Sequence, residues 1–167
     1  MDRDDAIANL KHSFHKTRLT EKVSVDADAL GAILYDNDNK PNLEVPAKVR
    51  AIAINDLVRY FHGKSAANGW WSESDRANPF VVPCKLMLAV SELSEAMEGH
   101  RKNLMDDKLP HRKMIEVELG DALIRIFDMA GFLGLDLGGA TMEKDAYNDV
   151  RADHKAEARA ATGGKAY

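Results

Sequence analysis

Two stretches of the chain, Val90-Ser-Glu-Leu-Ser-Glu-Ala-Met97 and Glu118-Leu-Gly-Asp-Ala-Leu-Ile124, carry the pattern that decides the fold. In each stretch two acidic residues stand three positions apart, among apolar residues that recur every three or four positions. This interval is the period of an amphipathic α-helix, and residues three apart lie on one face of it. The pattern predicts two helices that each present a pair of carboxylates, and a turn between them would bring both pairs to one place.

The same period extends outward from these stretches over most of the chain. It predicts helices over residues 47–64, 85–101, 112–133 and 138–155. We therefore expect an all-α protein, built as an antiparallel four-helix bundle with the two acidic helices as its central hairpin. Gly120 interrupts the helix over 112–133 at a cost of about 1 kcal/mol relative to alanine, so we expect another backbone to approach closely there.

The apolar faces of the two acidic helices predict what these helices pack against. In the helix over 85–101, Glu92 and Glu95 lie at the edge of an apolar arc of about 120° and are expected to be half buried. The arc consists of Leu86, Ala89, Val90, Leu93, Ala96 and Met97. The helix over 112–133 is apolar on nearly all sides, which is typical of an interior helix. Its apolar surface exceeds what its neighbours in one subunit would cover, so we expect a homodimer or a dimer of dimers.

Pro41, Pro46 and the polar run over residues 36–40 predict a break before the helical region. The chain is therefore expected to comprise an N-terminal extension over residues 1–46, a helical domain over 47–155 and a flexible tail over 156–167. The pattern assigns no role to the extension.

Composition excludes several classes of protein. The chain has 167 residues, of which 45% are hydrophobic and 30% charged, as expected for about one globular domain. A net charge of −4 argues against a broad basic surface for polymeric nucleic acid. Cys84 is the only cysteine, which excludes an intrachain disulfide and a thiolate zinc cluster. No window approaches the ~18 apolar residues of a membrane span, so we expect a cytoplasmic protein that does not enter a membrane.

The four acidic residues of the two stretches suit a hard divalent cation. Glu92 and Glu95 on one helix and Glu118 and Asp121 on the next would supply only oxygen ligands. Mg²⁺ is usually bound by carboxylates together with phosphate oxygens and waters. We expect a Mg²⁺ site, with Mn²⁺ as a substitute.

The order of these motifs resembles that of the MazG-like, all-α nucleoside triphosphate pyrophosphatases. The resemblance rests on Glu92-x-x-Glu95 followed by Glu118-x-x-Asp121, on Asn68-Gly-Trp-Trp71 before them, and on Glu143-Lys-Asp-Ala-Tyr-Asn-Asp-Val-Arg151 after them. It covers about residues 49–155. One position departs from the pattern, because Ser91 stands where many members of the family carry a further Glu.

The resemblance implies hydrolysis of a nucleoside or deoxynucleoside triphosphate between the α and β phosphates, which yields the monophosphate and pyrophosphate. Glu92, Glu95, Glu118 and Asp121 would be the metal ligands. Glu95 and Glu118 would also be catalytic, with Glu95 preferred for orienting or deprotonating the attacking water. In the alternative, the metal lowers the pKa of its own water and no dedicated base is needed.

The substrate is expected to meet a cationic stripe and an aromatic loop. Lys144, Asn148 and Arg151 stand at i, i+4 and i+7, which places them on one face of a helix, and the matching residues of the family contact phosphates. Trp70 and Trp71 are candidates for stacking a base, and His62 is a further substrate-binding candidate.

Simpler interpretations compete with each of these assignments. A single Glu-x-x-Glu pair is ordinarily a solvated helix face, and tryptophans ahead of a helix are usually packing anchors. Two other functions also stay open. The first is a dUTP- or dCTP-specific enzyme on the same scaffold, and the second is a non-catalytic helical module that binds a nucleotide or a protein.

Overall fold

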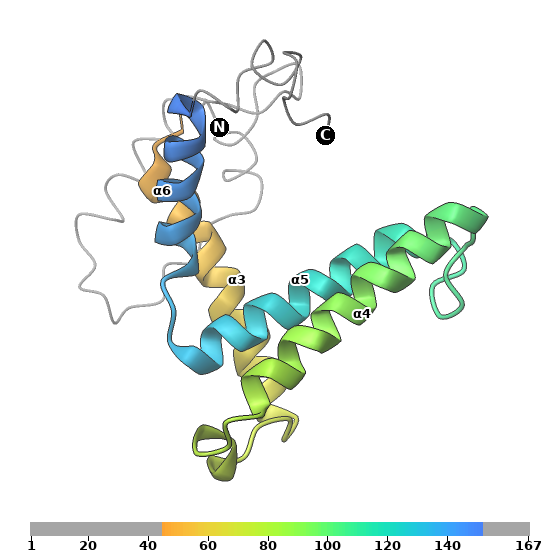
Figure 1. The fold of residues 1–167 in the computed structure, drawn as a ribbon, viewed down its shortest axis with the longest axis horizontal. Coiled ribbons are helices and arrows are strands. Elements are labelled where there is room, and N and C mark those ends of the chain that lie inside the picture. The colour runs from red at the N-terminus through yellow and green to blue at the C-terminus, as the bar shows by residue number, and fades with distance from the viewer. Residues whose placement is uncertain (1–44, 152–167) are drawn as a thin grey trace, which may run out of the picture. The chain divides into compact units, whose positions relative to one another are not determined.

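The computed structural model describes residues 45–151. The structure divides the chain into two units, Met1–Val49 and Arg50–Tyr167, and the site discussed below lies in the second. The described elements are the helices α3 (Ala47–Ala67), α4 (Val81–Lys102), α5 (Met114–Leu133) and α6 (Leu137–Val150), with the short 3-10 helix η1 (Glu73–Arg76) between α3 and α4 (Figure 1). The predicted all-α class is confirmed, and residues 45–151 contain no β-strand beyond one isolated bridge between Met105 and Lys113.

The four predicted helices are all present, and their ends follow from local chemistry. α4 begins four residues earlier than predicted, with Pro83 in its first turn, where a missing N–H is tolerated. α4 and α5 both end at residues in the left-handed conformation, Asn103 and Gly134. Asp136 is the N-cap of α6, and its side chain accepts a hydrogen bond from the Gly139 N–H. The predicted residues 1–44 of the extension, the end of the last helix and the tail lie outside the described part of the chain.

α4 and α5 pack side by side as an antiparallel hairpin (Figure 1). Their direction is fixed by two contacts, since Glu92 bonds Arg125 while Gly99, later on α4, meets Met114, earlier on α5. The closeness of the helices depends on small residues. A Cβ atom on Gly99 would lie only 2.8 Å from the Met114 Cβ atom, a separation that side chains do not tolerate.

The face that α4 turns toward α5 agrees with the predicted arc only at its alanines, Ala89 and Ala96. Its buried residues are Ala89, Glu92, Ala96 and Gly99. The larger residues of the predicted apolar arc are exposed, from Leu86 and Leu93 at 48% to Met97 at 66%. The small residues let the two backbones approach and leave the large side chains outside, so the arc is not the core of the single chain.

α5 shows a similar departure from the prediction. It is not an interior helix in the single chain, because Leu119 and Leu123 are 45% and 51% exposed. Nothing among the described residues comes within 4 Å of a Cβ atom built on Gly120, so the predicted close approach at this glycine is absent here. Close approaches to other helices occur instead at Gly99, Gly131 and Gly138.

The four helices are compatible with the predicted all-α bundle, and within residues 45–151 α4 and α5 form its extensively packed pair. α6 is joined to α3 near the end of α5. Asn55 donates to the Asp136 side chain at 2.7 Å and accepts from the Gly138 N–H at 2.8 Å. A Cβ atom on Gly138 would lie 2.1 Å from the Ala51 carbonyl oxygen, so this junction requires glycine.

None of the helices in the described region combines the length and the hydropathy that a membrane span requires.

Candidate metal and nucleotide site

The middle of the α4–α5 hairpin brings three of the four predicted carboxylates together. One carboxylate oxygen from each of Glu92, Glu95 and Glu118 lies within 4.8 Å of the others. Glu92 and Glu118 are buried, at 6% and 8% exposure, while Glu95 is exposed. Asp121, one turn further along α5, stays outside this group and is exposed. The cluster therefore has a closed side between the helices and an open side toward solvent.

The crowding of these carboxylates changes their affinity for protons. Burial, a hydrogen bond with Glu92 and the negative charges of Glu95, Glu92 and Asp121 together raise the pKa of Glu118 from 4.5 to about 7, with burial as the largest cause. Burial also raises the pKa of Asp121, the charge of Glu92 adds to this, and the positive charge of Arg125 opposes it. In the metal-free protein, a proton shared near Glu118 thus relieves part of the repulsion.

The donor set fits a small divalent cation. Ligand oxygens around one Mg²⁺, each about 2.0–2.1 Å from the ion, lie about 3 to 4 Å from one another. The 4.8 Å limit for Glu92, Glu95 and Glu118 is close to this, so a small movement of the side chains would suffice. The chemistry agrees as well, because all donors are carboxylate oxygens and one of them holds a proton that a cation would displace.

A guanidinium group lies beside the cluster. Nε and Nη2 of Arg125 both lie 2.5 Å from Oε1 of Glu92. Arg125 follows Asp121 by one turn on α5, and its side chain is 37% exposed. The ion pair gives the buried carboxylate of Glu92 a positively charged partner, which a charge removed from water needs.

An aromatic cluster lies further along the same face of α5. Oδ1 of the buried Asp128 accepts hydrogen bonds from Nε1 of Trp71 at 2.7 Å and lies 3.0 Å from Nδ1 of His62. Phe132 stacks on the Trp71 ring with centroids 3.9 Å apart, and Lys85 Nζ lies 4.2 Å from the same ring centre. Because these two groups cannot share one face, both faces of Trp71 are covered. In this arrangement Trp71 and His62 are packed, and neither presents an open ring face to a base.

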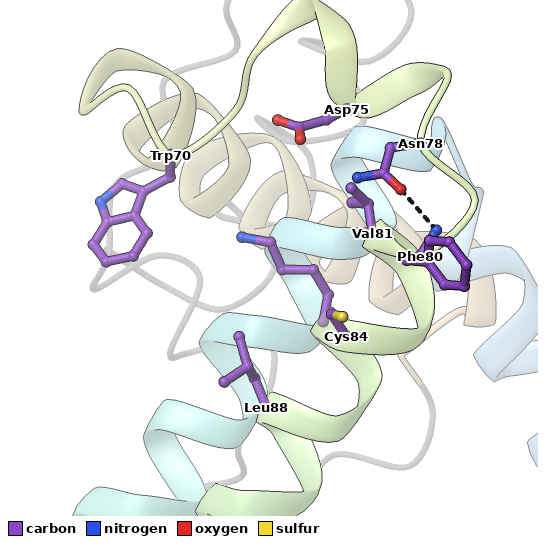
Figure 2. Close-up of a pocket in the computed structure, with 8 residues that line it drawn as sticks. Trp70, Asp75, Asn78, Phe80, Val81, Cys84 and Leu88 are labelled. Atoms are coloured by element: carbon purple, nitrogen blue, oxygen red, sulfur yellow. Dashed lines mark hydrogen bonds between the residues drawn. The ribbon is translucent and has the colours of Figure 1, made fainter.

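Trp70 lies differently, since it is 68% exposed and lines a pocket of about 170 Å³. In Figure 2, Trp70 and Phe80 stand on opposite sides of this hollow and Leu88 lies on the α4 side. The remaining lining residues are Asp75, Asn78, Val81, Cys84 and Lys85. The pocket is mainly apolar, with one ammonium group at its edge.

The pocket and the acidic cluster share one face of α4. Lys85, Leu88, Glu92 and Glu95 follow one another at steps of three and four residues, so their side chains form one stripe. Lys85 and Glu92 are separated by two turns, about 10 Å along the axis. A ligand with an anionic end at the cluster would therefore reach the pocket with its other end.

The predicted cationic stripe lies on α6 and at its end. Lys144 and Asn148 belong to α6 and Arg151 caps it. Lys144 Nζ and the Arg151 guanidinium lie 4.6 and 5.6 Å from the centre of the Tyr147 ring. Oδ1 of Asn148 is buried without a hydrogen-bond partner among the described atoms. α6 does not pack on the acidic hairpin in the single chain, so Lys144 and Asn148 are not brought to the carboxylates.

Sequence analysis missed Lys85, Arg125 and Asp128. A signal for two of them exists, because Glu118, Asp121, Arg125, Asp128 and Phe132 continue one stripe of α5 at steps of three and four. Ser91, the position that departs from the resembled pattern, donates its hydroxyl hydrogen bond to the Leu88 carbonyl at 2.7 Å.

Comparison of the chain with protein-family models, with curated proteins and with solved structures gives no match.

Proposed function

We propose that the protein is a Mg²⁺-dependent nucleoside triphosphate pyrophosphohydrolase. The observation that carries the proposal is the set of Glu92, Glu95 and Glu118 oxygens within 4.8 Å of one another, at the centre of two packed helices. Three carboxylates this close repel one another, so a cation or a proton must accompany them. The apolar pocket two turns away on the same stripe of α4 gives the site a second end, suited to a nucleoside.

In this proposal Glu92 and Glu118 hold the cation from the closed side of the cluster, while Asp121 extends the set on the open side. The cation would neutralise the phosphate oxygens of the substrate. Glu95 lies on the open, solvent-exposed side of the cluster, so it is the carboxylate that orients a water for attack on the α-phosphorus. The bond from this phosphorus to the bridging oxygen breaks, pyrophosphate leaves, and the proton of the water passes to a carboxylate or to solvent.

The proposed base site is the pocket beside Trp70. The exposed indole of Trp70 at the pocket edge offers a stacking surface for any base, whereas Trp71 and His62 are held in the packed cluster by Asp128. Lys85, at the edge of the pocket, would meet the sugar or the α-phosphate. Trp70→Ala should then raise KM with little change in the melting temperature, whereas Trp71→Ala should lower the melting temperature as well.

A homo-oligomer is part of the proposal. The exposed apolar stripes of α4 and α5 exceed what a free surface usually carries, and they flank the acidic cluster. A second copy packed there would cover them and bring its own α6 stripe toward the carboxylates. Mixing two inactive variants, Glu118→Gln and Lys144→Ala, would then restore part of the activity, because some mixed sites contain both native groups.

The first test is a turnover screen of the full chain with Mg²⁺ against common ribo- and deoxyribonucleoside triphosphates, resolving all phosphate products. Monophosphate with pyrophosphate is expected, and it should be lost on chelation and in Glu118→Gln. Glu116→Gln is the matched control, since Glu116 is an exposed carboxylate on the same helix, paired with Arg112. Turnover limited to dUTP or dCTP would indicate a specialised enzyme. Metal-dependent nucleotide binding without turnover would refute the proposal in favour of a binding module.

A further inference from the structure

Arg125 occupies a position that a cation bound at the carboxylates would contest. Its Nε and Nη2 atoms both bond one oxygen of Glu92, and Glu92 is also one of the three clustered donors. The guanidinium carries one positive charge, so a divalent ion a few ångströms away would repel it. The ion would also bind the same carboxylate of Glu92. Arg125 and the ion are therefore competitors for Glu92.

The side chain of Arg125 can leave Glu92 without being buried elsewhere. It is 37% exposed, while the Glu92 side chain is 8% exposed. Arg125 lies on α5 between Asp121 and Asp128, which places its root between the acidic cluster and the aromatic cluster. Arg125 reaches Glu92, and Glu92 is one turn from Leu88 of the pocket on α4, so the guanidinium lies at the end of the cluster from which a phosphate chain would run toward the pocket. A guanidinium group binds phosphate oxygens in pairs.

We propose that Arg125 is a substrate-binding residue that exchanges Glu92 for a phosphate group of the substrate when the metal binds. This inference rests on the proposed function, because it requires both a metal at the carboxylates and a phosphorylated ligand. In the metal-free protein Arg125 neutralises Glu92 and holds it in place. With metal present, the released guanidinium raises the affinity of the site for phosphates, so metal and phosphate binding are coupled through this residue.

The test measures binding rather than turnover. Mn²⁺ affinity of the full chain is measured from the electron paramagnetic resonance signal of free Mn²⁺, and inorganic pyrophosphate affinity by calorimetry with and without Mg²⁺. Arg125→Gln should bind Mn²⁺ about 5- to 50-fold more tightly than the unchanged protein. The gain in pyrophosphate affinity on adding Mg²⁺ should be smaller in Arg125→Gln than in the unchanged protein, by a similar factor. Arg125→Lys keeps the charge but not the paired donors, so its pyrophosphate affinity should be intermediate.

The control is Arg112→Gln, which removes an exposed arginine from an ion pair at the start of the same helix and should alter neither affinity. If Arg125→Gln leaves Mn²⁺ and pyrophosphate binding unchanged while the unchanged protein binds both, Arg125 is only structural and the inference fails alone. If the unchanged protein binds no Mn²⁺, the proposed metal site fails with it. Should Arg125→Gln not fold, Arg125→Lys decides, because equal pyrophosphate affinity in that variant would overturn the role of the paired donors.

Discussion

The metal-free protein is expected to lose stability as the pH rises, and Glu118 is the group responsible. Its folded-state pKa of about 7 lies above the ordinary 4.5. The folded chain holds this proton more tightly than the unfolded chain. The contribution of the protonated Glu118 to the free energy of unfolding is therefore fully present below the ordinary pKa, and it is lost as the pH rises through the folded-state pKa. Raising the pKa from 4.5 to about 7 corresponds to at most about 3.4 kcal/mol.

Water on the open side of the cluster screens part of this electrostatic effect. We therefore expect the free energy of unfolding to fall by about 1 to 2 kcal/mol as the pH rises. Glu118→Gln replaces the protonated carboxyl with a neutral amide of the same shape and should remove this pH dependence. At about pH 8 without metal, the variant should melt roughly 2 to 8 °C higher than the unchanged protein. With saturating Mg²⁺ the unchanged protein should melt at the higher temperature, because Mg²⁺ stabilises only the folded protein that binds it, and Glu118→Gln lacks one of the ligands.

Thermal melts followed by circular dichroism, between about pH 5 and pH 8 and with either chelator or Mg²⁺, measure both effects. Glu116→Gln should retain the pH dependence, since Glu116 is exposed and its partner Arg112 is exposed too. Equal pH dependence in the unchanged protein and in Glu118→Gln would refute the argument, because burial and crowding would then not hold a proton at Glu118.

Three further predictions test the fold around the site. Gly138→Ala should lower the melting temperature measurably, because the new Cβ atom would lie 2.1 Å from a backbone oxygen. Gly120→Ala has nothing within 4 Å of its new Cβ atom, so it should be neutral or stabilising by up to about 1 kcal/mol. A loss of stability in Gly120→Ala would show that another chain approaches there. Asp128→Ala leaves the Trp71 and His62 ring nitrogens without their acceptor. The free energy of unfolding in urea should fall by about 1 to 3 kcal/mol. An unchanged free energy of unfolding would mean that water replaces the carboxylate as the acceptor. Leu93→Lys should convert the proposed oligomer to monomer in light scattering, because Leu93 is 48% exposed in the single chain; an oligomer of unchanged mass would place the subunit contact elsewhere.

The helical periods of the sequence predicted the all-α class and the helices well, because a segment of about twenty residues repeats its apolar pattern over several turns. They predicted the inner face of α4 only in part. A sequence pattern ranks residues by hydrophobicity, so it includes Leu93 and Met97 in the core together with Ala96. The structure packs Ala96 and Gly99 against α5 and leaves Leu93 and Met97 exposed, because close contact of two backbones requires small residues.

The candidate site was predictable where the motif is local and not where it depends on a distant partner. Glu92 and Glu95 share one helix face by spacing alone, and two such pairs on consecutive helices imply a cluster. The ion pair of Glu92 with Arg125 joins residues 33 positions apart, and the bond of Trp71 to Asp128 joins residues 57 apart. Only the alignment of α4, α5 and the loop before them determines these contacts.

Because small side chains line the contact between α4 and α5, the hairpin alone withdraws little apolar surface from water. Its turn is short enough to close quickly, yet most of the free energy of the hydrophobic effect is released only when the large outward side chains are covered. When a second copy supplies that cover, acquiring the native state becomes a bimolecular reaction. Refolding should then accelerate as the chain becomes more concentrated, and dilution should return assembled protein to loosely packed single chains.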